Sequence, residues 1–274
     1  MNRWRRFVPP IFIDWFRSLF PRETGWRYLP DGWQVGDEVQ ADGWSAETVL
    51  ETYREKWPLF VRAVSGPGPL GVAHESSCER RDDMLSHNVV MSFGYVLGLA
   101  AQSKPRMSLL DWGGGTGHYY LFAQALFPSL ELDYHCKDVA SLARFGTALF
   151  PEAHFYDTSE CLQRSYDLVM ASASLLYARD WRALITELAG ATGRYLYIAN
   201  TPMVQHVPSF PFVQRHYATE YVGWCLNAKE VRQAAEKSDL VLVREFVYGY
   251  RPIIRGAPEQ PAYHGFLFER RHSI

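Results

Sequence analysis

A glycine-rich turn near the middle of the chain constrains its fold more than any other feature. Residues 109–118 read LLDWGGGTGH, so an apolar run ends at Asp111 and a helical pattern begins at His118. Because glycine has no Cβ, such a turn lets backbone N–H groups and a helix N-terminus approach a ligand closely. The pattern predicts a strand, a turn and a helix around a nucleotide-type ligand, with a tight structural turn as the alternative. The turn contains Gly113, Gly114, Gly115 and Gly117.

The spacing of these glycines narrows the ligand class. A dinucleotide site requires G-x-G-x-x-G, but the sixth position is His118 counted from Gly113 and Tyr120 counted from Gly115. No Gly-Lys-Ser or Gly-Lys-Thr follows, so the turn is not a phosphate-binding P-loop. The pattern that does fit is Asp-x-Gly-x-Gly-x-Gly.

Short β-rich runs alternate with helical patterns after residue 104, whereas the preceding third is aromatic and punctuated by Gly and Pro. This alternation predicts βαβ units and a mostly parallel α/β sheet. A helical pattern at 227–238 is followed by two strands joined only by a loop, which predicts a closing hairpin. We divide the chain into an extension, 1–104, and a second domain, 105–274. The predicted strands are 108–111, 130–136, 154–156, 166–171, 194–199, 240–247 and 263–269, and the front helices are 45–56 and 88–101.

The Asp-x-Gly-x-Gly-x-Gly motif resembles that of the class I S-adenosylmethionine-dependent methyltransferases, over residues 105 to about 270. The resemblance implies a Rossmann-like, seven-stranded, mostly parallel sheet with a terminal antiparallel hairpin. It also implies S-adenosyl-L-methionine as the cofactor, whose cationic amino and sulfonium groups suit a carboxylate beside the turn. The ribose-binding acid of the family corresponds to Asp138 and the adenine-reading acid to Asp157. The implied cofactor-binding set is Asp111, Gly113, Gly114, Gly115, Gly117, Asp138 and Asp157.

Longer segments are similar to a bacterial family of predicted methyltransferases that is considered with surface-polysaccharide biosynthesis. That resemblance implies a saccharide or another small molecule as the methyl acceptor. The segments are GPLGVAHE at 68–75, HNVVMSFGYVL at 87–97, LDYHCKD at 132–138, YDLVMASASLLY at 166–177, ATGRYLYIANTP at 191–202 and GAPEQ at 256–260.

Methyl transfer from a sulfonium is an in-line displacement that depends mainly on holding the reacting groups together. A general base would add roughly 10²–10⁴-fold with a hydroxyl or amine acceptor. The candidate bases are His74, beside Glu75, and His206, in the loop after the predicted strand 194–199; a structural histidine is the alternative for each. We expect His118 to line the cofactor pocket and no metal to bind, because the Cys and His residues lack the paired spacing of zinc sites.

Composition excludes several other classes. The chain has 28 Lys+Arg against 30 Asp+Glu, so no overall positive field draws in nucleic acid. Four cysteines without a CxxC pair indicate reduced thiols. No stretch reaches the ~18–20 apolar residues of a membrane-spanning helix. Together these features predict a cytoplasmic protein without a nucleic-acid partner.

The front of the chain has its own character. Six of the 9 Trp fall within residues 1–57, and residues 1–27 carry six arginines against Asp14 and Glu23. Apolar residues at helical spacing in 1–20 permit three interpretations: a helix lying on anionic lipid at the inner membrane face, a helix docked on the second domain, or a dimer contact. We interpret the aromatic extension as a lid and acceptor-binding surface.

Two other functions stay open at this point. The chain could be a non-catalytic scaffold that retains the fold at a membrane assembly. It could also be an NAD-dependent enzyme acting on a nucleotide sugar, although the third glycine of that fingerprint is missing.

Overall fold

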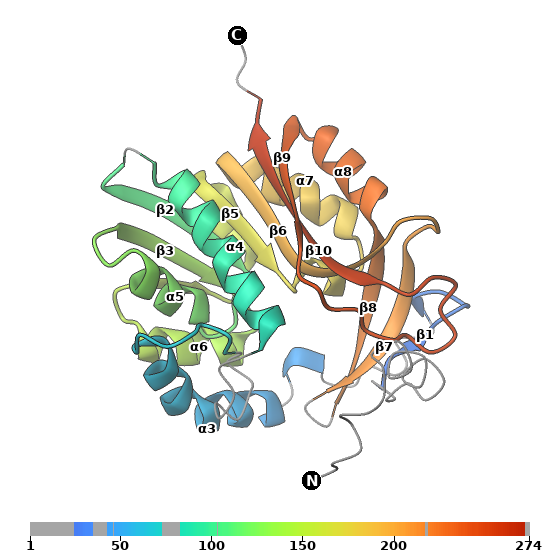
Figure 1. Cartoon of the computed structure of the whole chain (residues 1–274), viewed down its shortest axis with the longest axis horizontal. Coiled ribbons are helices and arrows are strands. Elements are labelled where there is room, and N and C mark those ends of the chain that lie inside the picture. The colour runs from blue at the N-terminus through green and yellow to red at the C-terminus, as the bar shows by residue number, and fades with distance from the viewer. Residues whose placement is uncertain are drawn as a thin grey trace, which may run out of the picture.

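A central sheet with helices on both faces organises the chain (Figure 1). Consecutive residues of its strands enter different hydrophobic clusters: Leu109 packs with α4 (Met84–Ala100) and α5 (His118–Leu126), and Leu110 packs with α7 (Trp181–Ala191) and α8 (Ala228–Glu236). This follows from the two-residue period of a strand. The computed structural model describes residues 25–34, 43–45, 47–72, 83–102, 104–216 and 219–271.

Seven strands form the predicted α/β sheet, in the order β4-β3-β2-β5-β6-β10-β9. All run parallel except β10, which is antiparallel to both β6 and β9. The predicted Rossmann-like sheet with its terminal hairpin is therefore confirmed. The strands are β2 (Arg106–Trp112), β3 (Glu131–Lys137), β4 (His154–Tyr156), β5 (Tyr166–Ser172), β6 (Thr192–Val204), β9 (Leu240–Val247) and β10 (Ala262–Arg270).

Three further strands extend this sheet and were not predicted. After the fifth strand of the predicted sheet, the chain forms an antiparallel hairpin of β7 (Phe210–His216) and β8 (Thr219–Asn227). The end of β6 pairs with β8, and β1 (Arg27–Tyr28) pairs with β7. The hairpin is apolar on both faces, since Phe210 and Val213 belong to different clusters. The alternation that marks a one-sided strand is therefore absent.

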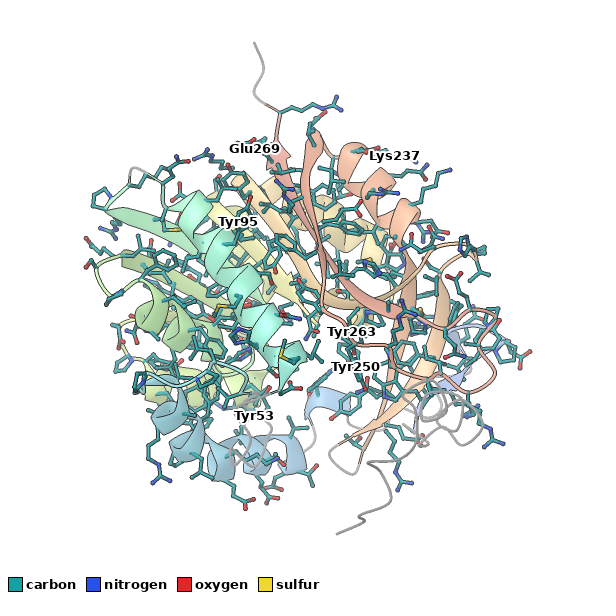
Figure 2. All side chains as sticks on the ribbon, viewed as in Figure 1. Tyr53, Tyr95, Lys237, Tyr250, Tyr263 and Glu269 are labelled. Carbon is teal, nitrogen blue, oxygen red and sulfur yellow. The ribbon has the colours of Figure 1, made fainter. Side chains whose placement is uncertain are left out.

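The helices of the front third pack against the sheet. We predicted that the first would end at Trp57-Pro58, but α3 (Glu47–Val64) continues through Pro58, because Phe60 and Val64 are buried in the same cluster as strands β2 and β3. The α4 helix begins at a cap, where the Asp83 carboxylate accepts the Ser86 N–H at 2.9 Å. Figure 2 shows side chains filling the space between α4 and the strands. The domain boundary at 104 stays a prediction. A further helix, α6 (Ala140–Leu149), lies between β3 and β4 along the chain.

The tryptophans of the front third that the structure describes have two kinds of surroundings. Trp57 is buried in the main core. The other three contact the hairpin or its neighbours: Trp26 stacks on Phe212 and Trp33 on Trp224, with ring centroids 4.8 and 5.4 Å apart, and Trp44 packs against Tyr221. The aromatic surplus therefore joins the extension to the hairpin. The predicted surface helix in 1–20 lies outside the described residues.

Within the described ranges, no helix combines the length and the apolar character that crossing a membrane requires.

The burial of α3 predicts that this helix unfolds together with the sheet. Phe60 is 0% exposed and contacts Phe122 of α5, whereas its neighbour Leu59 is 38% exposed. Phe60→Ala should lower the free energy of unfolding by about 3–5 kcal/mol. Leu59→Ala should change it by roughly 0.5 kcal/mol. Denaturant unfolding measures both, and equal small effects would show that α3 is not part of the cooperative core.

Candidate functional site

A cavity of about 710 Å³ opens at the carboxyl ends of β2, β3, β5 and β6. Its floor comes from the turns after the first three of these strands, at 112–113, 137–139 and 172–174, and from Asn200 in β6. Open α/β sheets bind their ligands at this edge. The remaining walls come from α3, α4, α5 and α7 and from the 3₁₀ turns Gly43–Ser45 and Leu175–Tyr177.

The glycine turn, which follows β2, contacts the ends of β3 and β5, the strands on either side of β2. Gly113 donates its N–H to the Lys137 carbonyl at 2.7 Å, and a Cβ built on Gly113 would lie 2.3 Å from the Ser174 Cβ. Gly117, with φ +87°, directly precedes α5 and caps it. Close approach and left-handed backbone therefore require glycine at these two positions. The N-terminus of α5 opens toward the cavity, which His118 lines as predicted.

Asp111 lies beneath the turn. Its side chain is fully buried, and Oδ2 accepts the Tyr134 hydroxyl at 2.6 Å, whereas Oδ1 has no hydrogen-bond partner within the part of the chain that the structure describes. A Cβ on Gly114 would lie 2.3 Å from the same Oδ2, so this glycine, between the first two motif glycines, makes room for the carboxylate. Burial raises the pKa of Asp111 to about 7, and the nearby Asp138 carboxylate adds to the rise. Asp111 thus supports the turn from below and does not line the cavity.

Asp138 lies in the cavity wall at the end of β3. Its Oδ2 accepts the N–H of Gly115 at 2.7 Å, and its Oδ1 accepts the N–H of Val139 at the same distance. These contacts fix a carboxylate directly beside the glycine turn. Next to it, the Lys137 ammonium lies 4.8 Å from the centre of the Trp112 ring, and both residues also line the cavity.

The other predicted site residues are not brought to this cavity. Asp157, which follows β4, is exposed and absent from the cavity lining. His206 is also exposed. It lies in a turn where the Glu259 carboxylate accepts the backbone N–H groups of Gln205, His206 and Val207. His74 lies outside the described residues. Of the predicted set, the structure places Gly113, Asp138 and His118 in the lining and Asp111 just below it.

Several residues that line the cavity were not among the predicted binding or catalytic residues. Asn200 is the most distinctive, because its φ is +48° and its buried amide oxygen has no hydrogen-bond partner among the described residues. Ala173, at the end of the neighbouring strand, also has a positive φ, of +52°. Strained backbone of this kind is common at functional sites. Trp44, Tyr53 and Tyr177 complete an aromatic wall, for which the aromatic surplus was the only signal.

Comparison with known proteins gives structural similarity alone. No protein-family model matches the sequence, and no curated protein matches it. The chain is similar to magnesium protoporphyrin IX methyltransferase from Synechocystis, at 14% identity and a TM-score of 0.48, covering 81% of this chain and 98% of that one. It is also similar to a 1,6-didemethyltoxoflavin-N1-methyltransferase from Burkholderia thailandensis, at 11% identity and a TM-score of 0.47, covering 70% and 82%. A third similar structure is an S-adenosylmethionine-dependent methyltransferase from Clostridium acetobutylicum, at 10% identity and a TM-score of 0.45, covering 67% and 91%.

The raised pKa of Asp111 predicts a pH-dependent stability. A carboxyl whose pKa rises from 3.8 to about 7 on folding contributes stability that is complete below pH 3.8 and is lost as pH rises through 7. Asp111→Asn removes this contribution. The unfolding free energy of the variant, relative to that of wild type, should therefore rise between pH 3.8 and 7 by up to about 1.4 kcal/mol per pH unit. Urea unfolding at several pH values measures the difference. A difference independent of pH would contradict a protonated Asp111.

Proposed function

We propose that the protein transfers a methyl group from S-adenosyl-L-methionine to a small-molecule acceptor. The observation that carries the proposal is the pairing, in one cavity, of a glycine turn opening a helix with a carboxylate fixed at the end of the next strand. The seven-stranded order with one antiparallel strand supports it, because the sequence resemblance implies that arrangement. The similar solved structures named above are methyltransferases and agree with it.

The residues present fit a cofactor of this size and charge. The cavity, at about 710 Å³, lies in the range of about 300–1,000 Å³ typical of small-molecule sites. The backbone of Gly113 lines the cavity, and a Cβ on this residue would meet Ser174. Only glycine therefore lets the backbone pass this close to the space for the ligand. The Asp138 carboxylate offers acceptors for hydroxyl groups, and the buried Asn200 oxygen offers an acceptor for an N–H or O–H group.

When bound, the cofactor supplies an electrophilic methyl group on a sulfonium, and the chain supplies position and shielding. Asp138 and the glycine turn would hold the adenosyl part, since they lie together at the end of β3. Trp44, Tyr53 and Tyr177 would exclude water from the acceptor side, because their rings line the same cavity. Holding two reactants in line is the main requirement of such a displacement.

The proposed acceptor is a polar small molecule or saccharide. The aromatic wall includes Trp44 and Tyr177, whose ring centroids are 5.1 Å apart, and the lining also includes the carboxylates Asp180 and Glu187. Flat rings beside carboxylates suit a ligand with apolar faces and hydroxyl or amino groups. A link with surface polysaccharides rests on the sequence resemblance. Among the described histidines, His118 is the one that lines the cavity, so it replaces His206 as the candidate general base.

Calorimetry with S-adenosylhomocysteine tests the cofactor assignment. Wild type should bind one molecule per chain. Asp138→Asn should weaken binding at least about tenfold, which corresponds to ~1.4 kcal/mol, through the lost charge beside Gly115. Asp157→Asn is the matched control and should bind as wild type, because Asp157 is exposed outside the cavity lining. No binding by wild type, with saturable binding of NAD instead, would replace the proposal with the dinucleotide alternative.

The aromatic wall predicts a separation of acceptor methylation from cofactor binding. Trp44→Ala should retain S-adenosylhomocysteine affinity and reduce transfer of labelled methyl to a glycan or metabolite fraction by about tenfold or more, because it opens the acceptor side. Trp33→Ala is the control, since Trp33 stacks on Trp224 outside the lining. Cofactor binding without methyl transfer by wild type to any fraction would favour the scaffold alternative.

A further inference from the structure

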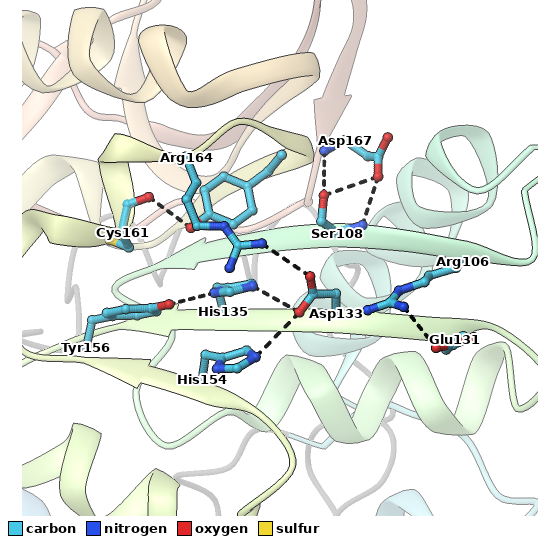
Figure 3. Close-up of polar contacts among 11 residues, drawn as sticks. Arg106, Ser108, Glu131, Asp133, His135, His154, Tyr156, Cys161, Arg164 and Asp167 are labelled. Carbon is cyan, nitrogen blue, oxygen red and sulfur yellow. Dashed lines mark hydrogen bonds and ion pairs between the residues drawn. The ribbon is translucent and has the colours of Figure 1, made fainter.

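A second cluster of ligand-type side chains lies on β3 and β4, apart from the cavity (Figure 3). Asp133 and His135 are two residues apart on β3, so they project from the same face of the sheet. His154 on β4 is the direct register partner of His135. None of the three lines the cavity, and this face of β3 is opposite to that of Tyr134, which packs with α5.

The ligand atoms of the three side chains lie close together. Asp133 Oδ1 lies 3.0 Å from His135 Nε2 and 3.6 Å from His154 Nε2, and all three atoms lie within 4.8 Å of one another. Ligands held at about 2.0–2.2 Å from a tetrahedral Zn²⁺ are separated by roughly 3.4 Å. Two of the ligand separations therefore already suit a single ion.

Neighbouring groups orient these ligands. The other ring nitrogen of His135, Nδ1, is hydrogen-bonded to the Tyr156 hydroxyl at 2.9 Å, which directs Nε2 toward Asp133. Arg164 Nη2 lies 3.5 Å from Asp133 Oδ2, so the guanidinium occupies one carboxylate oxygen and leaves Oδ1 facing the histidines. Metal-binding histidines and carboxylates are commonly oriented in this way by outer hydrogen bonds.

Exposure differs across the cluster in a way that suits ion entry. The His135 side chain is 0% exposed, Asp133 20% and His154 55%. The rings of His135 and His154 are stacked at 4.5 Å and 17°. Because a metal lies near the plane of each imidazole that binds it, the exposed His154 ring must turn out of this stack to coordinate. The buried His135 and the half-buried Asp133, which are hydrogen-bonded to each other, form the fixed half of the site, and His154 closes it from solvent.

We propose that Asp133, His135 and His154 form a binding site for Zn²⁺, with its fourth position open to water. Two imidazoles and one carboxylate suit Zn²⁺ better than Ca²⁺ or Mg²⁺, which prefer oxygen ligands throughout. An ion bound here would join β3 to β4, a three-residue strand that pairs only with β3 among the described strands. The proposal is independent of the methyltransferase proposal, because no cavity residue takes part.

Calorimetry of the full chain with Zn²⁺, after treatment with a chelator and its removal, tests the site. Wild type should bind one Zn²⁺ per chain and unfold at a higher temperature with the ion than without it. His154→Ala should weaken binding at least about tenfold and abolish the thermal shift. Since His154 is more than half exposed, this variant should fold as wild type does without the ion.

Three further variants separate the site from adventitious binding. Tyr156→Phe removes the hydrogen bond to His135 and should weaken binding by roughly 10–100-fold. His206→Ala, which removes another exposed histidine, and Cys78→Ser, which removes a thiol, should bind Zn²⁺ as wild type does. Absence of saturable binding by wild type, or equal binding by His154→Ala, would overturn the proposal and leave a polar cluster in which His135 is hydrogen-bonded to Asp133 and His154 lies 3.6 Å from it.

Discussion

The contact of the Asp111 carboxylate with the underside of the glycine turn is the interaction on which the candidate site depends. A buried carboxylate with one unpartnered oxygen is costly, and its raised pKa expresses that cost. It is accommodated because Gly114 carries no Cβ and because Tyr134 donates a hydrogen bond. Above it, the turn is fixed to Lys137 and packed on Ser174, so the ends of β3 and β5 are joined through the turn after β2.

The opposite side of the cavity depends on the aromatic front of the chain. Trp26 and Trp33 stack on the β7–β8 hairpin, and Trp44 bridges the hairpin and Tyr177. The extension therefore lines the cavity through Trp44 and Tyr53, and the hairpin supports Trp44 through Tyr221, which does not itself line the cavity. More than 150 residues separate Trp44 from Tyr221.

Local patterns predicted the parts of the molecule that are determined locally. The glycine turn could be predicted because a run of glycines directly after an apolar strand is a local signal. The alternation of strand and helix patterns predicted the sheet in the same way. The hairpin was missed because both its faces are buried, which removes the two-residue alternation. Asp157 and His206 were placed at strand ends correctly, but their side chains are exposed outside the cavity lining. The distant pairings of Trp44 and of Asp133 with His154 are set by packing and register, which spacing along the chain does not reveal.

A crystal structure of the protein with S-adenosylhomocysteine tests the central claim most directly. The account predicts the ligand in the cavity at the carboxyl edge, against the glycine turn, with a ribose hydroxyl in hydrogen-bond contact with Asp138. A ligand bound elsewhere, or a cavity that stays without ligand at saturating concentration, would contradict it.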